Sequence, residues 1–136
     1  MTYLDEELIE DFKKINTPIV IFPKERHNSI VQKINDNIRF SGSQIAWSLL
    51  KKSTYLGATT SQASLKSLNK KIKLIAEGDV FFVGDSTDNA YSIDVKDLSL
   101  ALRIFSTIPQ HTYITQEDQS WIACISFEGD IYFAIL

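Results

Sequence analysis

Apolar residues recur at helical spacing through most of the first half of the chain. Leu4, Leu8, Phe12 and Ile15, for example, fall on one face of a helix. Four segments share this kind of pattern and are expected to form helices: residues 4–15, 28–38, 43–57 and 65–75. The β-branched run 17–23 lies between two prolines, which predicts a short edge strand. Residues 58–64 lack apolar periodicity and are expected to form a loop.

After Gly78 the pattern changes to short strands. Residues 79–85 and 90–94 are strand candidates on either side of a sequence rich in turn-forming residues. Asp94 is expected to cap a helix over residues 95–108. This helix is apolar around most of its circumference, which predicts burial on more than one side.

From His111 onward, strand-like runs alternate with short turns. The runs 111–115, 120–127 and 131–136 predict an antiparallel meander joined by hairpin loops. The last run, IYFAIL, is apolar on both faces, which is typical of a strand covered on both sides. It is therefore expected to be a central strand of the sheet.

These elements predict a single α+β domain over residues 1–136. Its sheet is expected to be mainly antiparallel, with about five or six strands and a C-terminal meander, packed by about five helices. Residues 1–78 should be mainly helical. Residues 79–136 should be mainly strand, with one buried helix.

The composition is that of a globular protein from a reducing compartment. Hydrophobic residues make up 44% of the chain and charged residues 23%. The single cysteine, Cys124, cannot form an intrachain disulfide. No apolar run approaches the roughly 20 residues of a membrane span, and the acidic N-terminal sequence differs from a signal peptide. A cytoplasmic protein without membrane contact is expected.

Charge is strongly segregated along the chain. Residues 1–23 carry a net charge of −3, residues 24–75 a net charge of +8, and residues 76–136 a net charge of −8. Such asymmetry concerns partners or internal pairing rather than the fold.

Motifs for catalysis or for cofactor and metal binding are not found. All five glycines are isolated, so no phosphate-binding loop is predicted. His27, His111 and Cys124 are far apart in the sequence, unlike the ligands of a zinc site. Cys124 lies mid-strand, where a thiol is usually a small core residue. A nuclease with the two histidines as acid and base is a disfavoured alternative, and the chain is not expected to be an enzyme.

Acidic residues of the C-terminal half fall mostly at strand ends and turns. Seven of them are the predicted partner-binding residues: Asp79, Asp85, Asp88, Glu117, Asp118, Glu128 and Asp130. Turns on one side of a meander tend to cluster, so some of these carboxylates are expected to form a negative surface that attracts a cationic partner. Carboxylates are also ordinary turn formers, and the pattern favours the two roles equally.

The basic middle region is the basis of an alternative function. Its ten lysines and arginines, between residues 24 and 73, are mostly lysines with few aromatic residues among them. This pattern is more typical of solvated helix faces than of a nucleic-acid-binding surface. Partial pairing with the acidic N-terminal helix is a further interpretation. A nucleic-acid-binding or regulatory adaptor domain that uses residues 24–73 remains the alternative.

The C-terminal half resembles a known class of proteins. With its strand pair, capped buried helix and the sequence SWIACISFEGDIYFAIL, it is similar to small bacterial immunity proteins that neutralise polymorphic toxins, including those of contact-dependent growth inhibition systems. The resemblance rests on this texture and on Trp121, Glu128, Gly129 and Asp130. It implies an inhibitor that binds the C-terminal toxin domain of a larger secreted protein. Many such toxins are basic nucleases, and an acidic inhibitor surface would mimic the phosphates of their substrate.

Overall fold

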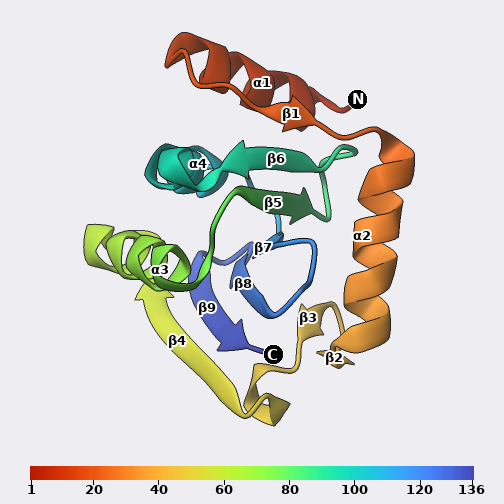
Figure 1. Cartoon of the computed structure of the whole chain (residues 1–136), viewed down its shortest axis with the longest axis vertical. Coiled ribbons are helices and arrows are strands. Elements are labelled where there is room, and N and C mark those ends of the chain that lie inside the picture. Colours follow the sequence, from red (N-terminus) through yellow and green to blue (C-terminus); the bar gives the residue numbers. More distant parts are fainter.

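A seven-stranded antiparallel sheet forms the centre of the computed structural model, which describes residues 1–136 (Figure 1). The strand order is β1-β6-β5-β7-β8-β9-β4, and β2 and β3 form a separate hairpin. The helices are α1 (Tyr3–Lys14), α2 (Lys24–Asn37), α3 (Gln62–Ile75) and α4 (Leu98–Phe105), with short 3-10 helices at Trp47–Leu49 and Val95–Asp97. The strands are β1 (Val20–Ile21), β2 (Phe40–Ser41), β3 (Gln44–Ile45), β4 (Lys52–Ala58), β5 (Asp79–Gly84), β6 (Tyr91–Asp94), β7 (Thr112–Thr115), β8 (Trp121–Ile125) and β9 (Asp130–Ile135).

The predicted α+β class and the antiparallel C-terminal meander are confirmed. Four predicted helices correspond to α1, α2, α3 and α4, and the proline-bounded strand β1 lies at the edge of the sheet. Asp94 caps the 3-10 helix Val95–Asp97, because its carboxylate accepts the backbone N–H of Lys96 at 2.9 Å. The single helix predicted over residues 95–108 is instead this 3-10 helix followed by the shorter α4, whose N-cap is Asp97. The predicted loop 58–64 is shorter than expected, since β4 ends at Ala58 and α3 begins at Gln62.

The helix predicted over residues 43–57 is wrong, and this error changes the count of elements. The segment forms β3, a 3-10 turn and β4, which adds a strand to the main sheet. Trp47 is buried and stacks on Tyr132 of β9, with ring centroids 5.1 Å apart. Gly57, expected to end a helix, instead sits at a register shift of β4 with a φ of 107°, a value that favours glycine. Packing against β9 therefore overrode the local helical pattern.

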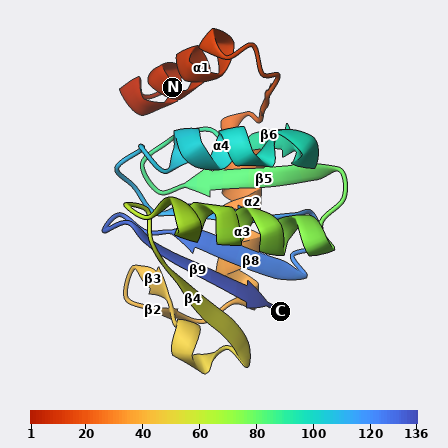
Figure 2. The same cartoon turned by 90° about the vertical axis from the view of Figure 1, so that its left-hand side faces the viewer.

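Helices cover the two faces of the sheet unequally. α1, α3 and α4 pack on one face, and α2 alone crosses the other (Figures 1 and 2). The alternation of side chains in β5 shows the division, because Val80 and Phe82 join the first core whereas Phe81 and Val83 join the second. The position of α2 determines where the sheet remains open to a partner.

The last strand has a neighbour on each side, as predicted, although it lies next to the edge strand β4 and not in the middle of the sheet. β9 pairs with β8 on one side and with β4 on the other. Ile131 and Phe133 point into the core under α3 and α4, and Ala134 belongs to the core on the α2 face. The hydrophobic C-terminal sequence is thus explained by burial on both faces.

Candidate partner-binding surface

The antiparallel register gathers several predicted acidic residues at one end of the sheet. Gly84, the last residue of β5, pairs with Thr112 of β7, and Thr112 pairs with Ile125, the last residue of β8. The β5–β6 loop and the β8–β9 turn therefore lie at the same end. Four of the predicted residues are found there: Asp85, Asp88, Glu128 and Asp130. We call this set the carboxylate end.

The other three predicted acidic residues lie at the opposite end of the sheet. Asp79 begins β5 opposite Asp94, and the β7–β8 turn carries Glu117 and Asp118. Glu117 is already engaged within the chain, because its carboxylate forms an ion pair with Arg26 and its carbonyl oxygen accepts the Lys33 ammonium at 2.7 Å. The seven residues therefore do not form one surface, and the carboxylate end holds the larger share.

The side chain of Asp5 in α1 holds the β5–β6 loop in place through hydrogen bonds. Its fully buried carboxylate accepts the backbone N–H groups of Asp88 (2.8 Å) and Asn89 (3.2 Å) and the hydroxyl of Tyr91 (2.5 Å). It also accepts bonds from Thr2, with which it forms a capping box. Burial by itself would raise the pKa of Asp5, but these hydrogen bonds outweigh it and hold the pKa below its ordinary value. The loop is thus anchored on a buried carboxylate.

Gln110 holds the other side of the same loop. Its side-chain oxygen accepts the N–H groups of Ser86 and Thr87, each at 3.0 Å, and its amide donates to the Thr112 hydroxyl at 3.0 Å. Asp85 in turn accepts the backbone N–H of His111 at 2.9 Å through Oδ1. The bond to Oδ1 gives the exposed Asp85 carboxylate a defined position, and Oδ2 forms no hydrogen bond or ion pair within the chain.

A side chain at Gly84 would disrupt this arrangement. A Cβ atom there would overlap the side-chain amide of Gln110. Gly84→Ala is therefore expected to displace Gln110 and to lower the free energy of unfolding by about 2 kcal/mol, measured by urea denaturation. The amides of Ser86 and Thr87 should also exchange faster with solvent. Gly78→Ala meets no atom within 4 Å but strains a backbone with a φ of 77°, so it should lower the free energy of unfolding without displacing Gln110 or selectively exposing those two amides. Equal protection of the two amides in both variants would contradict this account of the loop.

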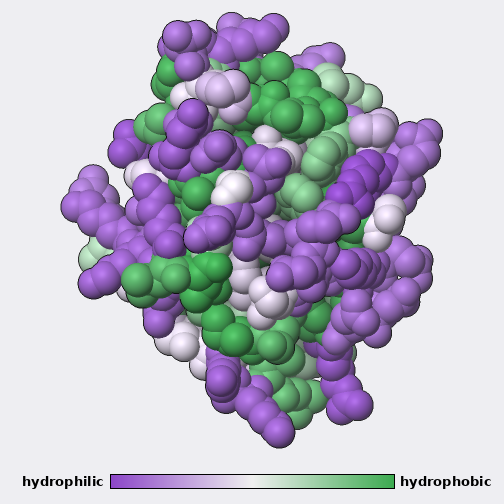
Figure 3. Space-filling model, viewed as in Figure 1, coloured by the Kyte–Doolittle hydropathy of each residue, from purple (hydrophilic) through white to green (hydrophobic).

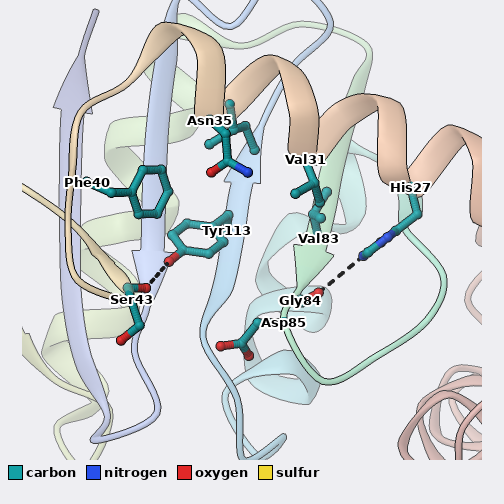
Figure 4. Close-up of a pocket in the computed structure, with 10 residues that line it drawn as sticks. His27, Val31, Asn35, Phe40, Ser43, Val83, Gly84, Asp85 and Tyr113 are labelled. Carbon is teal, nitrogen blue, oxygen red and sulfur yellow. Dashed lines mark hydrogen bonds between the residues drawn. The ribbon is translucent and has the colours of Figure 1, made fainter.

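Beside Asp85, a cavity of about 340 Å³ opens between α2 and the ends of β5 and β7 (Figure 4). Val31 and Ile34 of α2, Val83 of β5, Phe40 of the hairpin and the ring of Tyr113 supply apolar walls. The Tyr113 hydroxyl donates to the carbonyl oxygen of Ser43 at 3.3 Å, which fixes the ring against the hairpin. The cavity is therefore built from side chains of α2, β5, β7 and the β2–β3 hairpin.

Polar groups line the same cavity at its mouth. The side chains of His27, Asn35 and Asp85 contribute to the lining, and Figure 4 shows His27 reaching from α2 toward the end of β5. His27 Nε2 lies 3.2 Å from the carbonyl oxygen of Gly84, to which it donates. Asp85 is therefore the one acidic group in the lining.

The carboxylates of this end influence the pKa of three side chains: Cys124, Tyr113 and Tyr132. Burial raises the pKa of Cys124, and the charges of Asp85 and Glu128 raise it further. Burial likewise raises the pKa of Tyr113, with contributions from Cys124 and Asp85. Burial and then Asp130 raise the pKa of Tyr132. The negative charges of the carboxylate end therefore act on side chains of the α2 face of the sheet, including Tyr113 in the cavity lining.

The structure places both histidines near the end of β5. His27 contacts Gly84, and the backbone of His111 pairs with Asp85. His111 is buried, and its Nδ1 accepts the backbone N–H of Phe127 at 3.0 Å. This bond gives His111 a structural role in the β8–β9 turn. Cys124 is buried within the sheet, and its raised pKa is that of a core thiol.

The basic residues do not gather on one surface. Lys24, Arg26 and Lys33 belong to α2 on one face of the sheet, whereas the lysines of α3 lie on the other face. Arg26 is the only lysine or arginine in an ion pair, and no ion pair joins α1 to α2 or α3. The segregated charges therefore remain largely unneutralised within the chain.

Sequence reasoning missed three residues that build the site: Asp5, Gln110 and Tyr113. Asp5 had a local signal, because Thr2 and Asp5 have the spacing of a capping box. Gln110 and Tyr113 had none, since their roles depend on how the β5–β6 loop and α2 meet β7.

Comparison of the chain with known proteins identified no relative. No protein-family model, no curated protein and no solved structure matches the chain. No group of three or more His, Cys, Asp or Glu side chains is placed to hold a metal ion. None of the helices has the length and hydrophobicity needed to cross a bilayer.

Proposed function

We propose that this protein is an immunity-type inhibitor that binds a basic toxin domain, of the kind found in nucleases, through its carboxylate end. The observation that carries the proposal is the arrangement of Asp85, Asp88, Glu128 and Asp130 on two neighbouring connections at one end of the sheet. None of them forms an ion pair with a lysine or an arginine of the chain. Asp88 lies 3.5 Å from the amino group of Met1, and Asp130 accepts the Tyr55 hydroxyl at 2.8 Å.

The rigidity of these connections supports a binding role. The β5–β6 loop is held by Asp5 and Gln110, and the β8–β9 turn by His111 and by Ser126, whose hydroxyl accepts the N–H of Asp130 at 2.9 Å. Carboxylates on fixed backbone lose little conformational entropy when a partner binds. A negative surface of this kind also accelerates association with a cationic partner and opposes binding of anionic ones.

Apolar surface accompanies the charge. Phe127, next to Glu128 in the β8–β9 turn, is 63% exposed. Hydrophilic groups cover most of the face seen in Figure 3, with apolar patches between them. An exposed aromatic residue beside carboxylates is a composition found in protein-binding sites with a polar rim.

The first experiment identifies the partner. The DNA immediately upstream of the gene is sequenced, where the proposal predicts a large open reading frame that ends in a small basic domain. Co-expression of this chain should then rescue cells from that domain. An unrelated neighbourhood, or a domain that kills equally well in the presence of the chain, would contradict the proposal.

Charge substitutions test where that partner binds. Asp85→Asn combined with Glu128→Gln is expected to weaken the complex by about 100-fold at low ionic strength, chiefly because two charge pairs are lost. Asp79→Asn combined with Asp118→Asn removes the same charge from the opposite end of the sheet and should change the affinity by less than about threefold. Isothermal titration calorimetry of both double variants measures the difference. Equal effects would show that only net charge matters and not this surface.

A further inference from the structure

The carboxylate end has a cavity beside it whose chemistry specifies one kind of side chain. Resting on the function proposed above, we infer that the cavity between α2 and the ends of β5 and β7 is an anchor pocket for an arginine side chain of the protein partner. The pocket would make that arginine a dominant contact of the interface. It adds a specific, shaped site to what the charged surface alone provides.

The size and walls of the pocket fit one long side chain. Its volume of about 340 Å³ lies at the lower end of the range of ligand pockets, roughly 300–1,000 Å³. Val31 of α2 and Val83 of β5 lie next to each other in its lining, and the ring of Tyr113 lies to one side of them (Figure 4). An arginine side chain laid along this groove would place its methylene groups against these apolar groups and its guanidinium group at the end that carries Asp85.

The charge at the mouth requires a cation. Asp85 is an exposed carboxylate, and the bond from His111 to Oδ1 leaves Oδ2 without a partner. No lysine or arginine of the chain lies within ion-pair distance of it. His27, the other titratable group at the mouth, directs Nε2 to the Gly84 carbonyl and so does not occupy Asp85.

The neighbours of Asp85 favour arginine over lysine. The guanidinium group is planar and weakly hydrated, and it stacks on aromatic rings such as that of Tyr113. It also has N–H donors arranged to bind a carboxylate such as that of Asp85 through two parallel hydrogen bonds. The ammonium group of lysine is compact and strongly hydrated, so it gains less from this pocket.

The pocket is tested on the free protein with small probes. Nα-acetyl-arginine N-methylamide is titrated into ¹⁵N-labelled protein, and the amide shifts of Gly84, Asp85 and Tyr113 are followed by NMR. A dissociation constant on the order of 1 mM is expected for a ligand of this size. The matching citrulline derivative, which keeps the shape but has no charge, should bind at least tenfold more weakly. The lysine derivative should fall between the two.

Variants separate the pocket from the general negative charge. Asp85→Asn should weaken arginine binding at least fivefold, whereas Glu128→Gln, which removes a charge from the same end, should change it by less than twofold. Val31→Phe fills the pocket and leaves every charge in place, and it should abolish the shifts. The spectra of the free variants show whether each remains folded. No shifts up to about 20 mM arginine probe, or equal binding of the citrulline probe, would overturn the inference.

Failure of the pocket and failure of the proposed function give different results. If the partner complex forms and depends on Asp85 and Glu128 together, but Val31→Phe binds the partner as tightly as wild type, the surface is correct and the pocket is not. If the arginine probe binds as described and no basic domain binds the chain, the pocket is correct and the immunity function is not.

Discussion

Replacement of Asp5 by asparagine is expected to destabilise the protein by about 3 kcal/mol. The carboxylate accepts hydrogen bonds on both oxygens, so an amide would direct its NH₂ group toward other donors, such as the backbone N–H of Asp88 or the hydroxyl of Tyr91. Buried donors left without an acceptor cost their full desolvation free energy. Urea denaturation at pH 7 measures the loss.

The control for Asp5 is its exposed neighbour Glu6. Glu6→Gln removes the same charge from the same helical turn and should change the free energy of unfolding by less than about 0.5 kcal/mol. A loss for Asp5→Asn no larger than that for Glu6→Gln would show that the β5–β6 loop does not depend on Asp5.

The effect of Asp5→Asn should also depend on pH, in a direction set by the lowered pKa. The hydrogen bonds hold the folded-state pKa of Asp5 below its ordinary value of 3.8. The carboxylate therefore contributes stability that is present above that ordinary value and is lost as the pH falls through the folded-state pKa. The gap in unfolding free energy between wild type and Asp5→Asn should narrow between pH 7 and pH 2. A gap that is constant or widens in acid would contradict the assignment.

Replacement of Phe105 by alanine is expected to cost about 4 kcal/mol, the largest effect of a single substitution considered for this protein. Phe105 of α4 is 1% exposed and stacks on Phe82 with ring centroids 4.4 Å apart. It also packs against Phe12 of α1 and Tyr91 of β6. Loss of the ring would leave a cavity at the junction of two helices and two strands.

The control for Phe105→Ala is the same substitution at the exposed residue Phe127. Phe127→Ala removes the same atoms from a side chain that is 63% exposed, so its effect on thermal or urea unfolding should stay within about 0.5 kcal/mol. Near-equal losses for the two variants would mean that α4 is not packed as described.

Much of this fold could be predicted from the sequence because its core elements have strong local patterns. α1 and α3 carry a clear helical period of hydrophobic residues, and burial follows that period, whereas α4, β8 and β9 are apolar on more than one side and are buried accordingly. The exception is β4, whose sequence has apolar spacing compatible with a helix. A strand inside a sheet has a neighbour on each side, and β8 is only one of the neighbours of β9. The predicted position of β9 therefore already indicated that the sheet contains a further strand, which is β4.

The site was less predictable because it depends on which end of the sheet each turn occupies. The sequence singled out turn carboxylates, but Glu128 and Asp118 look alike locally and lie at opposite ends. The ion pair between Arg26 and Glu117 joins residues 91 positions apart, and no local pattern indicates it. The cavity depends on the path of α2 across the sheet, which follows from tertiary packing alone.

Amide hydrogen exchange of the chain, free and in complex with the basic domain that the proposed function predicts upstream of its gene, tests the central claim most directly. The account predicts slower exchange in the complex for residues 85–90 and 126–130, together with the α2 residues that line the cavity. Residues 77–79 and 117–120, at the opposite end of the sheet, should exchange as they do in the free protein. Protection confined to that opposite end, or to the lysines of α3, would contradict binding through the carboxylate end.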